Sequence, residues 1–377
     1  MEKRTFKNID GEISLLGFGA MRLPTKSDDP KDIDIDAVAK MIDTAIEGGV
    51  NYFDTAYPYH NQQSESAMRK TLVERYDRDR FYIATKLPVW LCESYEDYEK
   101  IFAKQLDNLG VDYVDFYLLH ALDRNSIAKH TKIGMFDFIK ELKANGKAKH
   151  IGFSFHDDYA TFEKLLSEYH DVVDFVQLQL NYLDWDVLET NKCYDLCVKY
   201  ELPVVVMEPV KGGTLADISP KANSLLKTAK PDQSIASWAM AYASSMPNVM
   251  TVLSGMSNQE QVEDNVKTLT NFEPLTDDDY ALLKNVVKEI QSMKLIPCTG
   301  CEYCIDCPEK INIPHIFSLY NSIQNGGKTL FDAGKLHKEI PEDNRADKCI
   351  ECGNCTAICP QSIKVPEHLK KIAKMFA

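Results

Sequence analysis

The cysteines are the residues of this chain whose spacing most directly suggests chemistry. Eleven occur in 377 residues, and eight of them fall between positions 298 and 359. Those eight form two runs, Cys298, Cys301, Cys304 and Cys307 before Pro308, and Cys349, Cys352, Cys355 and Cys359 before Pro360. In a reducing compartment, such crowding indicates metal ligation rather than disulfide bonds.

The spacing within the runs narrows the choice of metal group. The second run is a full Cys-x2-Cys-x2-Cys-x3-Cys-Pro pattern, which resembles bacterial [4Fe–4S] ferredoxins, and the first is one residue shorter before its last cysteine. A pair of zinc sites is the alternative. Zinc sites usually pair two short knuckles at a distance, whereas three thiolates at two-residue spacing wrap one corner of a cubane. The runs therefore predict two [4Fe–4S] clusters.

The ferredoxin resemblance also implies which cysteines share a cluster. In two-cluster ferredoxins, the fourth cysteine of each run ligates the other cluster. One set is then Cys298, Cys301, Cys304 and Cys359, and the other is Cys349, Cys352, Cys355 and Cys307. The 41 residues between the runs are too many for a compact β-ferredoxin turn, and 313–323 have helical periodicity. We expect a small, mainly α-helical ferredoxin-like domain.

A second group of reactive side chains occurs at the ends of apolar segments in the first 290 residues. Asp54, Lys86 and His120 end three successive segments, and Tyr59 follows Asp54 by five residues. Each residue alone has an ordinary structural explanation. An acid, a phenol, an ammonium and an imidazole at successive segment ends instead suggest one site for proton transfer.

The elements that must position these groups alternate between strand-like and helix-like segments. Eight short apolar runs predict strands at Leu15–Met21, Val50–Asp54, Phe81–Leu87, Val114–His120, His150–Phe155, Phe175–Asn181, Pro203–Met207 and Val249–Ser254. Helical periodicity lies between them, at Ile35–Glu47, Tyr95–Leu109, Met135–Ala144 and Tyr159–Tyr169. Eight βα units predict an α/β fold, a (β/α)8 TIM barrel with its chemistry at the C-terminal strand ends. A doubly wound open sheet is the alternative, but no Gly-x-Gly-x-x-Gly follows the first strand.

Four motifs in this region resemble the aldo-keto reductase family. They are Leu16–Arg22 (LGFGAMR), Asn51–Ala56 (NYFDTA), Tyr82–Lys86 (YIATK) and Tyr117–His120 (YLLH). The resemblance implies NAD(P)H-dependent interconversion of a carbonyl and an alcohol by a catalytic tetrad of Asp54, Tyr59, Lys86 and His120. Tyr59 would donate the proton, Lys86 would activate Tyr59, Asp54 would orient Lys86, and His120 would position the substrate carbonyl.

The same resemblance implies nucleotide contacts. They fall on Gly19, Met21, Ser154, Gln177, Met207, Pro209, Gly213, Asp264 and Asn265. Ser154 and Gln177 would contact the nicotinamide, and 208–213 resembles the loop on the pyrophosphate side. Gly255, Met256 and Gln261 stand where the family usually has basic residues for the 2′-phosphate. Both NADH and NADPH therefore remain candidate cofactors.

Composition excludes some function classes and divides the chain. The formal net charge of −14 makes a nucleic-acid partner or an anionic membrane surface unlikely, and no window has the ~20 apolar residues of a membrane helix. We expect a soluble, cytoplasmic protein. Residues 293–377 have 11 basic and 10 acidic residues, whereas 1–292 have a net charge of −15. The expected domains are a barrel at 1–292 and a cluster domain at 293–377.

The role of the clusters has several explanations at this stage. They would exchange electrons with a one-electron partner protein, or act as structural or redox-sensing groups beside an ordinary reductase. A redox-sensing or electron-carrying binding module on a non-catalytic barrel is the alternative from another class. The substrate is predicted only as a small aldehyde, ketone or sugar, because no basic cluster marks a phosphate site in the substrate loops.

Overall fold

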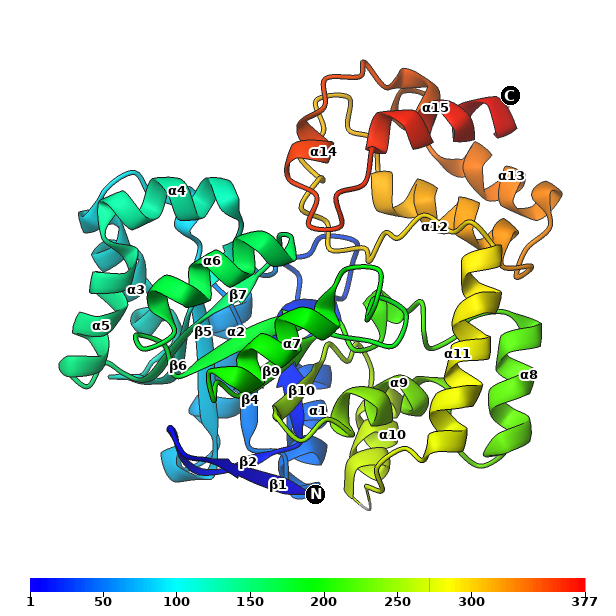
Figure 1. The fold of residues 1–377 in the computed structure, drawn as a ribbon. Coiled ribbons are helices and arrows are strands. Elements are labelled where there is room, and N and C mark those ends of the chain that lie inside the picture. Colours follow the sequence, from blue (N-terminus) through cyan, green and yellow to red (C-terminus); the bar gives the residue numbers. More distant parts are fainter. Residues whose placement is uncertain (271, 377) are drawn as a thin grey trace. The chain divides into compact units, whose positions relative to one another are not determined.

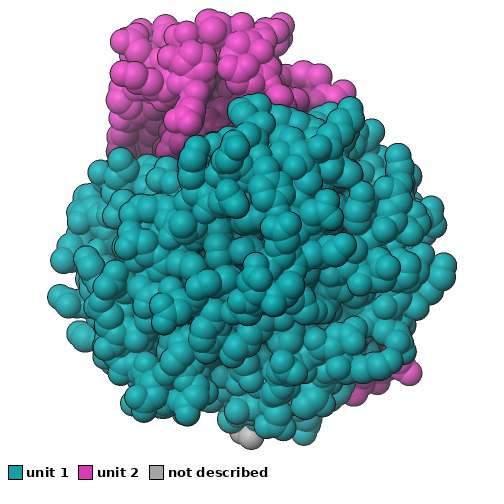
Figure 2. Space-filling model, turned by 90° about the vertical axis from the view of Figure 1, so that its left-hand side faces the viewer, with its two compact units in different colours: residues 1–209, 239–275 teal, residues 210–238, 276–377 magenta. Residues whose placement is uncertain are grey.

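The computed structural model describes residues 1–270 and 272–376. These residues form two compact units, which Figure 2 colours separately. The first unit contains residues 1–209 and 239–275, and the second contains 210–238 and 276–377. The units differ from the two domains expected from the sequence, 1–292 and 293–377, and that boundary stays a prediction.

The first unit is built on a closed barrel of eight parallel strands (Figure 1). In chain order these are β3 (Leu16–Gly19), β4 (Tyr52–Asp54), β5 (Tyr82–Leu87), β6 (Val114–Leu122), β7 (Ala148–Phe155), β8 (Phe175–Gln179), β9 (Val204–Met207) and β10 (Val249–Ser254). Each strand pairs with its neighbours in sequence, and β10 pairs with β3 to close the barrel. The expected (β/α)8 barrel is confirmed.

The strands form because their side chains suit a sheet that is buried on both faces. All six residues of β10 and all five of β8 are buried, without polar–apolar alternation. Parallel strands covered by helices have this continuous apolar pattern. Inside the barrel, aromatic side chains such as Tyr52, Phe116 and Phe175 pack in one cluster.

Helices follow the strands along the chain. They are α1 (Ile35–Glu47), α2 (Ser64–Met68), α3 (Tyr95–Leu109), α4 (Arg124–Ile133), α5 (Met135–Ala144), α6 (Tyr159–Tyr169), α7 (Thr190–Lys199), α9 (Ile235–Ser244) and α10 (Gln259–Thr270). Asp34 caps α1, and a capping box of Ser94 and Asp97 begins α3. Gly110 ends α3 at φ +68°, a conformation that favours glycine. The four helices expected from periodicity have the predicted bounds, whereas α4 was not expected.

A β-hairpin precedes the barrel and was also not expected. It consists of β1 (Lys3–Phe6) and β2 (Ile9–Ser14), which pair antiparallel. Ile9 and Ile13 are buried in the same cluster as the barrel side chains Tyr52 and Phe116. The hairpin therefore contributes two aliphatic side chains to the barrel core.

The second unit is helical. Its helices are α8 (Pro220–Ala229), α11 (Asp277–Ser292), α12 (Ile313–Gln324), α13 (Leu330–Glu339), α14 (Asn354–Ala357) and α15 (Val365–Phe376). Ile316, Phe317, Leu369 and Ile372 from α12 and α15 share one apolar core, against which several cysteines pack. This agrees with the expected mainly α-helical C-terminal region. No helix among residues 1–270 and 272–376 is long and apolar enough to cross a membrane.

Candidate active site and cysteine pocket

Three of the predicted catalytic residues lie on adjacent barrel strands. Asp54 ends β4, Lys86 is the next-to-last residue of β5, and His120 lies near the end of β6. Because β4 pairs with β5 and β5 with β6, all in parallel, the carboxyl ends of these strands meet at one mouth of the barrel. Tyr59 lies in the turn after β4, and its side chain is buried.

The structure brings these four side chains together. The Lys86 ammonium donates to Asp54 Oδ1 at 2.6 Å and to the Thr55 carbonyl at 2.8 Å. It also lies 3.5 Å from the Tyr59 hydroxyl. The rings of Tyr59 and His120 meet edge to face, with 5.8 Å between their centroids. The Lys86 ammonium therefore links the Asp54 carboxylate to the Tyr59 phenol, and the three side chains form one buried row.

Burial has the largest effect on the pKa values of these three side chains. It raises the pKa of Asp54 and lowers the pKa of Lys86, and the contact between the two opposes both shifts. Burial also raises the pKa of Tyr59 well above its ordinary value; Asp54 adds to this effect, and Arg22 opposes it. Tyr59 is therefore a protonated phenol at neutral pH.

His120 presents a neutral imidazole. Burial, followed by the charges of Lys86 and His156, lowers its pKa well below the ordinary value. Its Nδ1 is buried and has no hydrogen-bond partner among the described residues. A neutral imidazole has one nitrogen that donates and one that accepts a hydrogen bond.

A strand irregularity shapes the backbone beside His120. The pairing of β6 with β7 shifts register between Leu119 and Leu122, and Ala121 has φ +52°. The Ala121 N–H donates to Ser154 Oγ at 2.7 Å. Bulges of this kind redirect side chains and are frequent next to active sites. Ser154, predicted from the sequence as a nucleotide contact, thus also fixes the strand end that carries His120.

A buried polar network supports Lys86 and was not found from the sequence. Glu65 in α2 is 1% exposed, and it accepts hydrogen bonds from Thr85 Oγ1 at 2.7 Å and from Gln105 Nε2 at 3.0 Å. Gln105 Nε2 also lies 2.9 Å from the Lys86 carbonyl oxygen. Burial raises the pKa of Glu65, although three hydrogen bonds and Lys86 oppose the shift. No local motif marks these residues, because they come from three separate segments.

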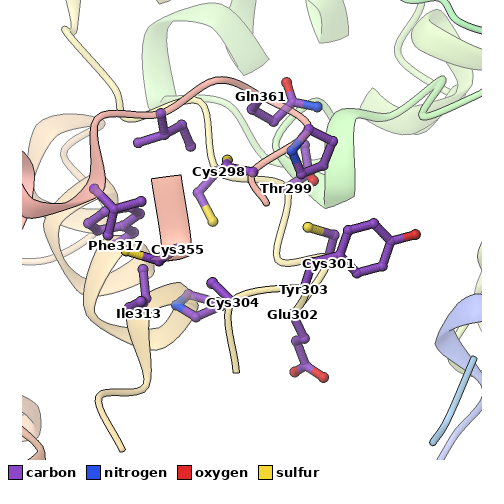
Figure 3. A pocket seen from close by; sticks show the side chains of 15 residues that line it. Cys298, Thr299, Cys301, Glu302, Tyr303, Cys304, Ile313, Phe317, Cys355 and Gln361 are labelled. Atoms are coloured by element: carbon purple, nitrogen blue, oxygen red, sulfur yellow. The ribbon is translucent and has the colours of Figure 1, made fainter. Parts of the chain in front are cut away.

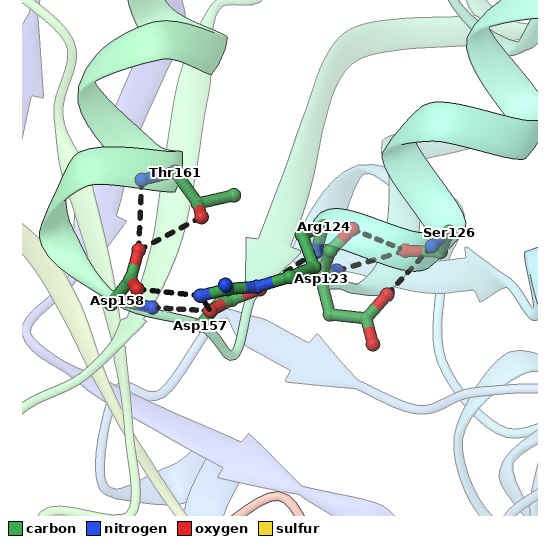
Figure 4. A network of polar contacts seen from close by, with 6 residues as sticks. All are labelled: Asp123, Arg124, Ser126, Asp157, Asp158 and Thr161. Atoms are coloured by element: carbon green, nitrogen blue, oxygen red, sulfur yellow. Dashed lines mark hydrogen bonds and ion pairs between the residues drawn. The ribbon is translucent and has the colours of Figure 1, made fainter.

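A second network ties the loops after β6 and β7 (Figure 4). Arg124 donates to both carboxylate oxygens of Asp157, at 3.0 and 2.7 Å, and to Asp158 at 2.5 Å. Asp158 caps α6 by accepting from the Thr161 N–H, and Asp123 caps α4. One guanidinium therefore joins the starts of two helices that follow neighbouring strands.

The predicted nucleotide contacts are distributed along the strand ends. Gln177 on β8 is 2% exposed, its Nε2 lies 3.5 Å from Met207 Sδ, and its Oε1 is buried without a partner among the described residues. Asn265 Nδ2 donates to Ser254 Oγ at 2.9 Å, and a Cβ on Gly19 would lie 3.3 Å from the Ser254 carbonyl oxygen.

The other predicted nucleotide contacts have less specific surroundings. Met21 lies in a 3-10 turn after β3, Pro209 is buried just after β9, and Asp264 lies on α10. Gly213 belongs to the second unit. The nucleotide roles of all nine residues stay predictions.

In the second unit, five cysteines line one pocket (Figure 3). They are Cys298, Cys301, Cys304, Cys355 and Cys359. Burial, followed by Cys301, Cys298 and Cys359, raises the pKa of Cys304 to about 12. Burial also raises the pKa of Cys355, and Cys349 and Cys352 add to that effect. The four thiols of the first predicted set are therefore neighbours, and so are three of the second set.

The rest of the pocket is largely apolar. Ile313 and Phe317 of α12, together with Ile363 and Val365, line it beside the thiols (Figure 3). Within 1–270 and 272–376, no three His, Cys, Asp or Glu side chains converge tightly enough to hold a single metal ion. Five of the eight clustered cysteines thus line one cavity of this unit.

Comparison with known proteins gives two family matches. The model of the aldo/keto reductase family matches residues 15–288, and that of the 4Fe-4S dicluster domain matches residues 297–363. An uncharacterized oxidoreductase of Bacillus subtilis, YqkF, is 25% identical over 77% of this chain and 97% of its own length. The L-galactose dehydrogenase of Arabidopsis thaliana is 26% identical over 75% of this chain and 92% of its own.

Solved structures also match about three quarters of the chain. The aldo-keto reductase AKR11C1 from Bacillus halodurans, in its holo form, is 26% identical, with a TM-score of 0.61 over 76% of this chain and 96% of that one. An aldo-keto reductase from Klebsiella pneumoniae in complex with NADPH is 19% identical, with a TM-score of 0.62 over the same shares, and shows the fold alone.

Proposed function

Because the chain belongs to the aldo/keto reductase family and also contains a 4Fe-4S dicluster domain, we propose that it interconverts a small carbonyl compound and its alcohol, with NAD(P)H as the hydride source. The observation that supports this proposal most strongly is the buried row of side chains from Asp54 through Lys86 to Tyr59. This arrangement puts a proton donor and a stabilising cation side by side in a low-dielectric site.

Tyr59 supplies the proton. In reduction, the carbonyl carbon gains a C–H bond, its oxygen gains an O–H bond, and the π bond between them is lost. The alkoxide that develops is a far stronger base than a phenolate, so a phenol with a raised pKa still gives up its proton. The Lys86 ammonium, 3.5 Å from the hydroxyl, stabilises the phenolate that remains, and Asp54 orients that ammonium.

His120 positions the substrate oxygen. Its imidazole is neutral, and its ring packs edge to face with Tyr59, so a carbonyl that accepts from His120 also lies near the phenol. The Trp90 ring lies 5.0 Å from the His120 ring and is 40% exposed. An exposed aromatic face at this place suits a small substrate with an apolar side.

The residues present fit a nicotinamide nucleotide, which supplies the hydride when bound. The buried Gln177 Oε1 lacks a partner among the described residues and suits the amide N–H of a carboxamide. For the 2′-phosphate, Gly255 and Met256 bring no charge, and Gln261 Oε1 already accepts from the Ser257 N–H at 2.7 Å. We therefore propose that the enzyme uses both NADH and NADPH.

We assign the eight clustered cysteines to two [4Fe–4S] clusters. The thiol set and the apolar lining of the pocket in Figure 3 suit such a group. When bound, the clusters supply one-electron exchange or a structural link between chain segments. An electron-transfer role would require an external one-electron partner protein, because the proposed barrel chemistry moves electrons in pairs.

The experiment that tests the proposed reaction replaces Tyr59 by phenylalanine. We expect Tyr59→Phe to lower carbonyl reduction by roughly 10²- to 10⁴-fold, because the proton donor is lost. Nucleotide affinity, measured by fluorescence titration, should stay near the wild-type value. Turnover at the wild-type rate in this variant would refute the assignment.

A second experiment separates the roles of the clusters. The purified protein is titrated anaerobically with NADH and, separately, with NADPH while cluster absorbance and EPR are recorded. Reduction of the clusters by either nucleotide would join the two chemistries in one electron path. If the clusters stay oxidised while an aldehyde is still turned over, they have a structural or sensory role or receive electrons from another donor.

A further inference from the structure

Glu65 is a buried carboxylate that is surrounded by hydrogen-bond donors. It lies in α2, is 1% exposed, and accepts at Oε1 from the Thr85 hydroxyl and from Gln105 Nε2. Its other oxygen, Oε2, accepts from Asn108 Nδ2 at 3.0 Å. A neutral carboxyl group would have to donate its proton to an acceptor, whereas these three neighbours all donate to Glu65. The geometry therefore suits the ionised form of Glu65.

The cation that acts on Glu65 is the buried Lys86. Burial lowers the pKa of Lys86, the contact with Asp54 opposes this shift most strongly, and the charge of Glu65 opposes it as well. Asp54 Oδ2 is buried and has no hydrogen-bond partner among the described residues. Lys86 therefore interacts with two buried acids, and of these two only Glu65 has both carboxylate oxygens in hydrogen bonds.

Gln105 connects the Glu65 carboxylate to the backbone of Lys86. Its Nε2 lies 3.0 Å from Glu65 Oε1 and 2.9 Å from the Lys86 carbonyl oxygen. The Tyr117 hydroxyl donates to Gln105 Oε1 at 2.8 Å, which fixes the orientation of the amide. Successive residues of a strand point to opposite faces, so the network meets Thr85 on one face of β5 while the Lys86 side chain extends from the other.

We propose that Glu65 is a positioning residue for the reaction: its carboxylate is a second counter-charge that keeps the Lys86 ammonium protonated, and through Gln105 it holds the end of β5 that carries Lys86. In this role Glu65 serves the carbonyl reduction proposed above, on which the inference rests. A charge in a buried site acts over several ångströms, because little water lies between the interacting groups. Loss of the Glu65 charge should therefore destabilise the charged form of Lys86.

The test compares the wild-type holoprotein with Glu65→Gln, which nearly keeps the size of the side chain and removes its charge. Other titratable groups also act on Lys86, Tyr59 or Glu65, and this variant leaves all of them in place: Asp54, His120, Arg22, Glu208 and Tyr117. Removal of a nearby negative charge lowers the pKa of an ammonium and of a phenol alike. The basic limb of the pH profile of kcat/KM should therefore move to lower pH by roughly one unit.

A second readout does not require turnover. The Cε signal of Lys86 in carbon NMR, identified by its absence in Lys86→Met, reports the protonation of the ammonium directly. In Glu65→Gln this signal should change to that of the neutral amine at lower pH than in the wild-type protein. The same signal in both proteins, over the pH range in which both stay folded, would overturn the proposal. If the wild-type protein reduced no aldehyde or ketone, the proposed function would fail, and this titration would still decide the role of Glu65.

Two matched variants separate the charge of Glu65 from its packing. Tyr117→Phe removes the hydrogen bond to Gln105 and changes no charge, so the protein should lose stability while the basic limb stays at its wild-type pH. Glu65→Gln combined with Asn108→Asp exchanges the amide and the carboxylate and keeps a hydrogen bond between them. The charge then lies at the half-buried position 108, where water screens it.

The double variant should fold even where Glu65→Gln alone does not, and its basic limb should still lie below the wild-type pH. An equal shift of the limb in Tyr117→Phe would show that packing, and not charge, sets the profile. A limb that returns to the wild-type pH in the double variant would likewise count against the proposal.

Discussion

The strand-end site and the cysteine pocket achieve their geometry in opposite ways. At the strand ends, Asp54, Lys86 and His120 extend from paired strands, and each of these residues is at most 3% exposed. In the cysteine runs, the chain is irregular outside the short helix α14, and the cysteines are half-buried or exposed. The strand ladder fixes the first site, and we expect cluster ligation to fix the second.

Backbone conformation strengthens this contrast. Glu302, Lys310, Glu351 and Ser362 in the cysteine-rich region all have positive φ angles. Each such conformation costs about 1–2 kcal/mol for a residue other than glycine. The strand-end site shows the same feature at Ala121, where a hydrogen bond from its N–H to Ser154 stabilises it. We therefore expect the cysteine region to depend on bound clusters for its shape more than the barrel site does.

The largest expected effect comes from breaking the buried ion pair. Lys86→Met should lower carbonyl reduction by roughly 100-fold or more and the free energy of unfolding by about 3–5 kcal/mol, because Asp54 is left buried without its partner. The double variant with Asp54→Asn should regain much of the stability but none of the activity. Denaturant unfolding and steady-state rates measure both quantities. Unchanged stability in the single variant would show that the site is not preformed by this pair.

Removal of iron tests the contrast between the two regions directly. After anaerobic chelation, we expect amide hydrogen exchange to become much faster in α12 and α15, because both helices share a core with the cysteines. The barrel strands should keep their protection. If chelation left the exchange rates of α12 and α15 unchanged, the idea that ligation holds the cysteine region would be contradicted.

A single cysteine variant sharpens the assignment of ligands. Cys359→Ser should lower the iron content from about eight to about four per chain, since each cluster holds four. If the fourth cysteine of each run ligates the other cluster, the EPR spectrum of Cys359→Ser should match that of Cys301→Ser and differ from that of Cys352→Ser. Cys92→Ser is the control, because Cys92 is buried outside both runs. A Cys359→Ser spectrum like that of Cys352→Ser would refute the crossover.

The smallest expected effect is on the pH dependence of stability. Burial lowers the pKa of His156 to about 4 from an ordinary value of 6.5. Between these values the unfolded chain binds the proton and the folded chain does not, so stability decreases as pH falls from about 6.5 to about 4. His156→Asn should make the free energy of unfolding less steep over this range. The same slope in both proteins would show that His156 does not contribute.

Much of the fold could be predicted from the sequence because its signals are local. Six of the eight barrel strands lie within the predicted apolar runs, β6 and β7 each extend two residues beyond theirs, and α1, α3, α5 and α6 have the bounds that periodicity gave. The β1–β2 hairpin and α4 were missed. The hairpin's buried side chains, Ile9 and Ile13, find their apolar neighbours on distant barrel strands. Neither element has the long periodic pattern that makes a helix or a buried parallel strand recognisable.

For the sites, the sequence by itself determined residue types and order: an acid, a phenol, an ammonium and an imidazole near strand ends, and two spaced runs of cysteines. Only the tertiary structure decided how these groups are held. The Glu65 network behind Lys86 and the close approach of Gly212 to Thr299 join residues that are far apart in the chain. Such contacts leave no local pattern, because they depend on packing that brings separate segments within a few ångströms of each other.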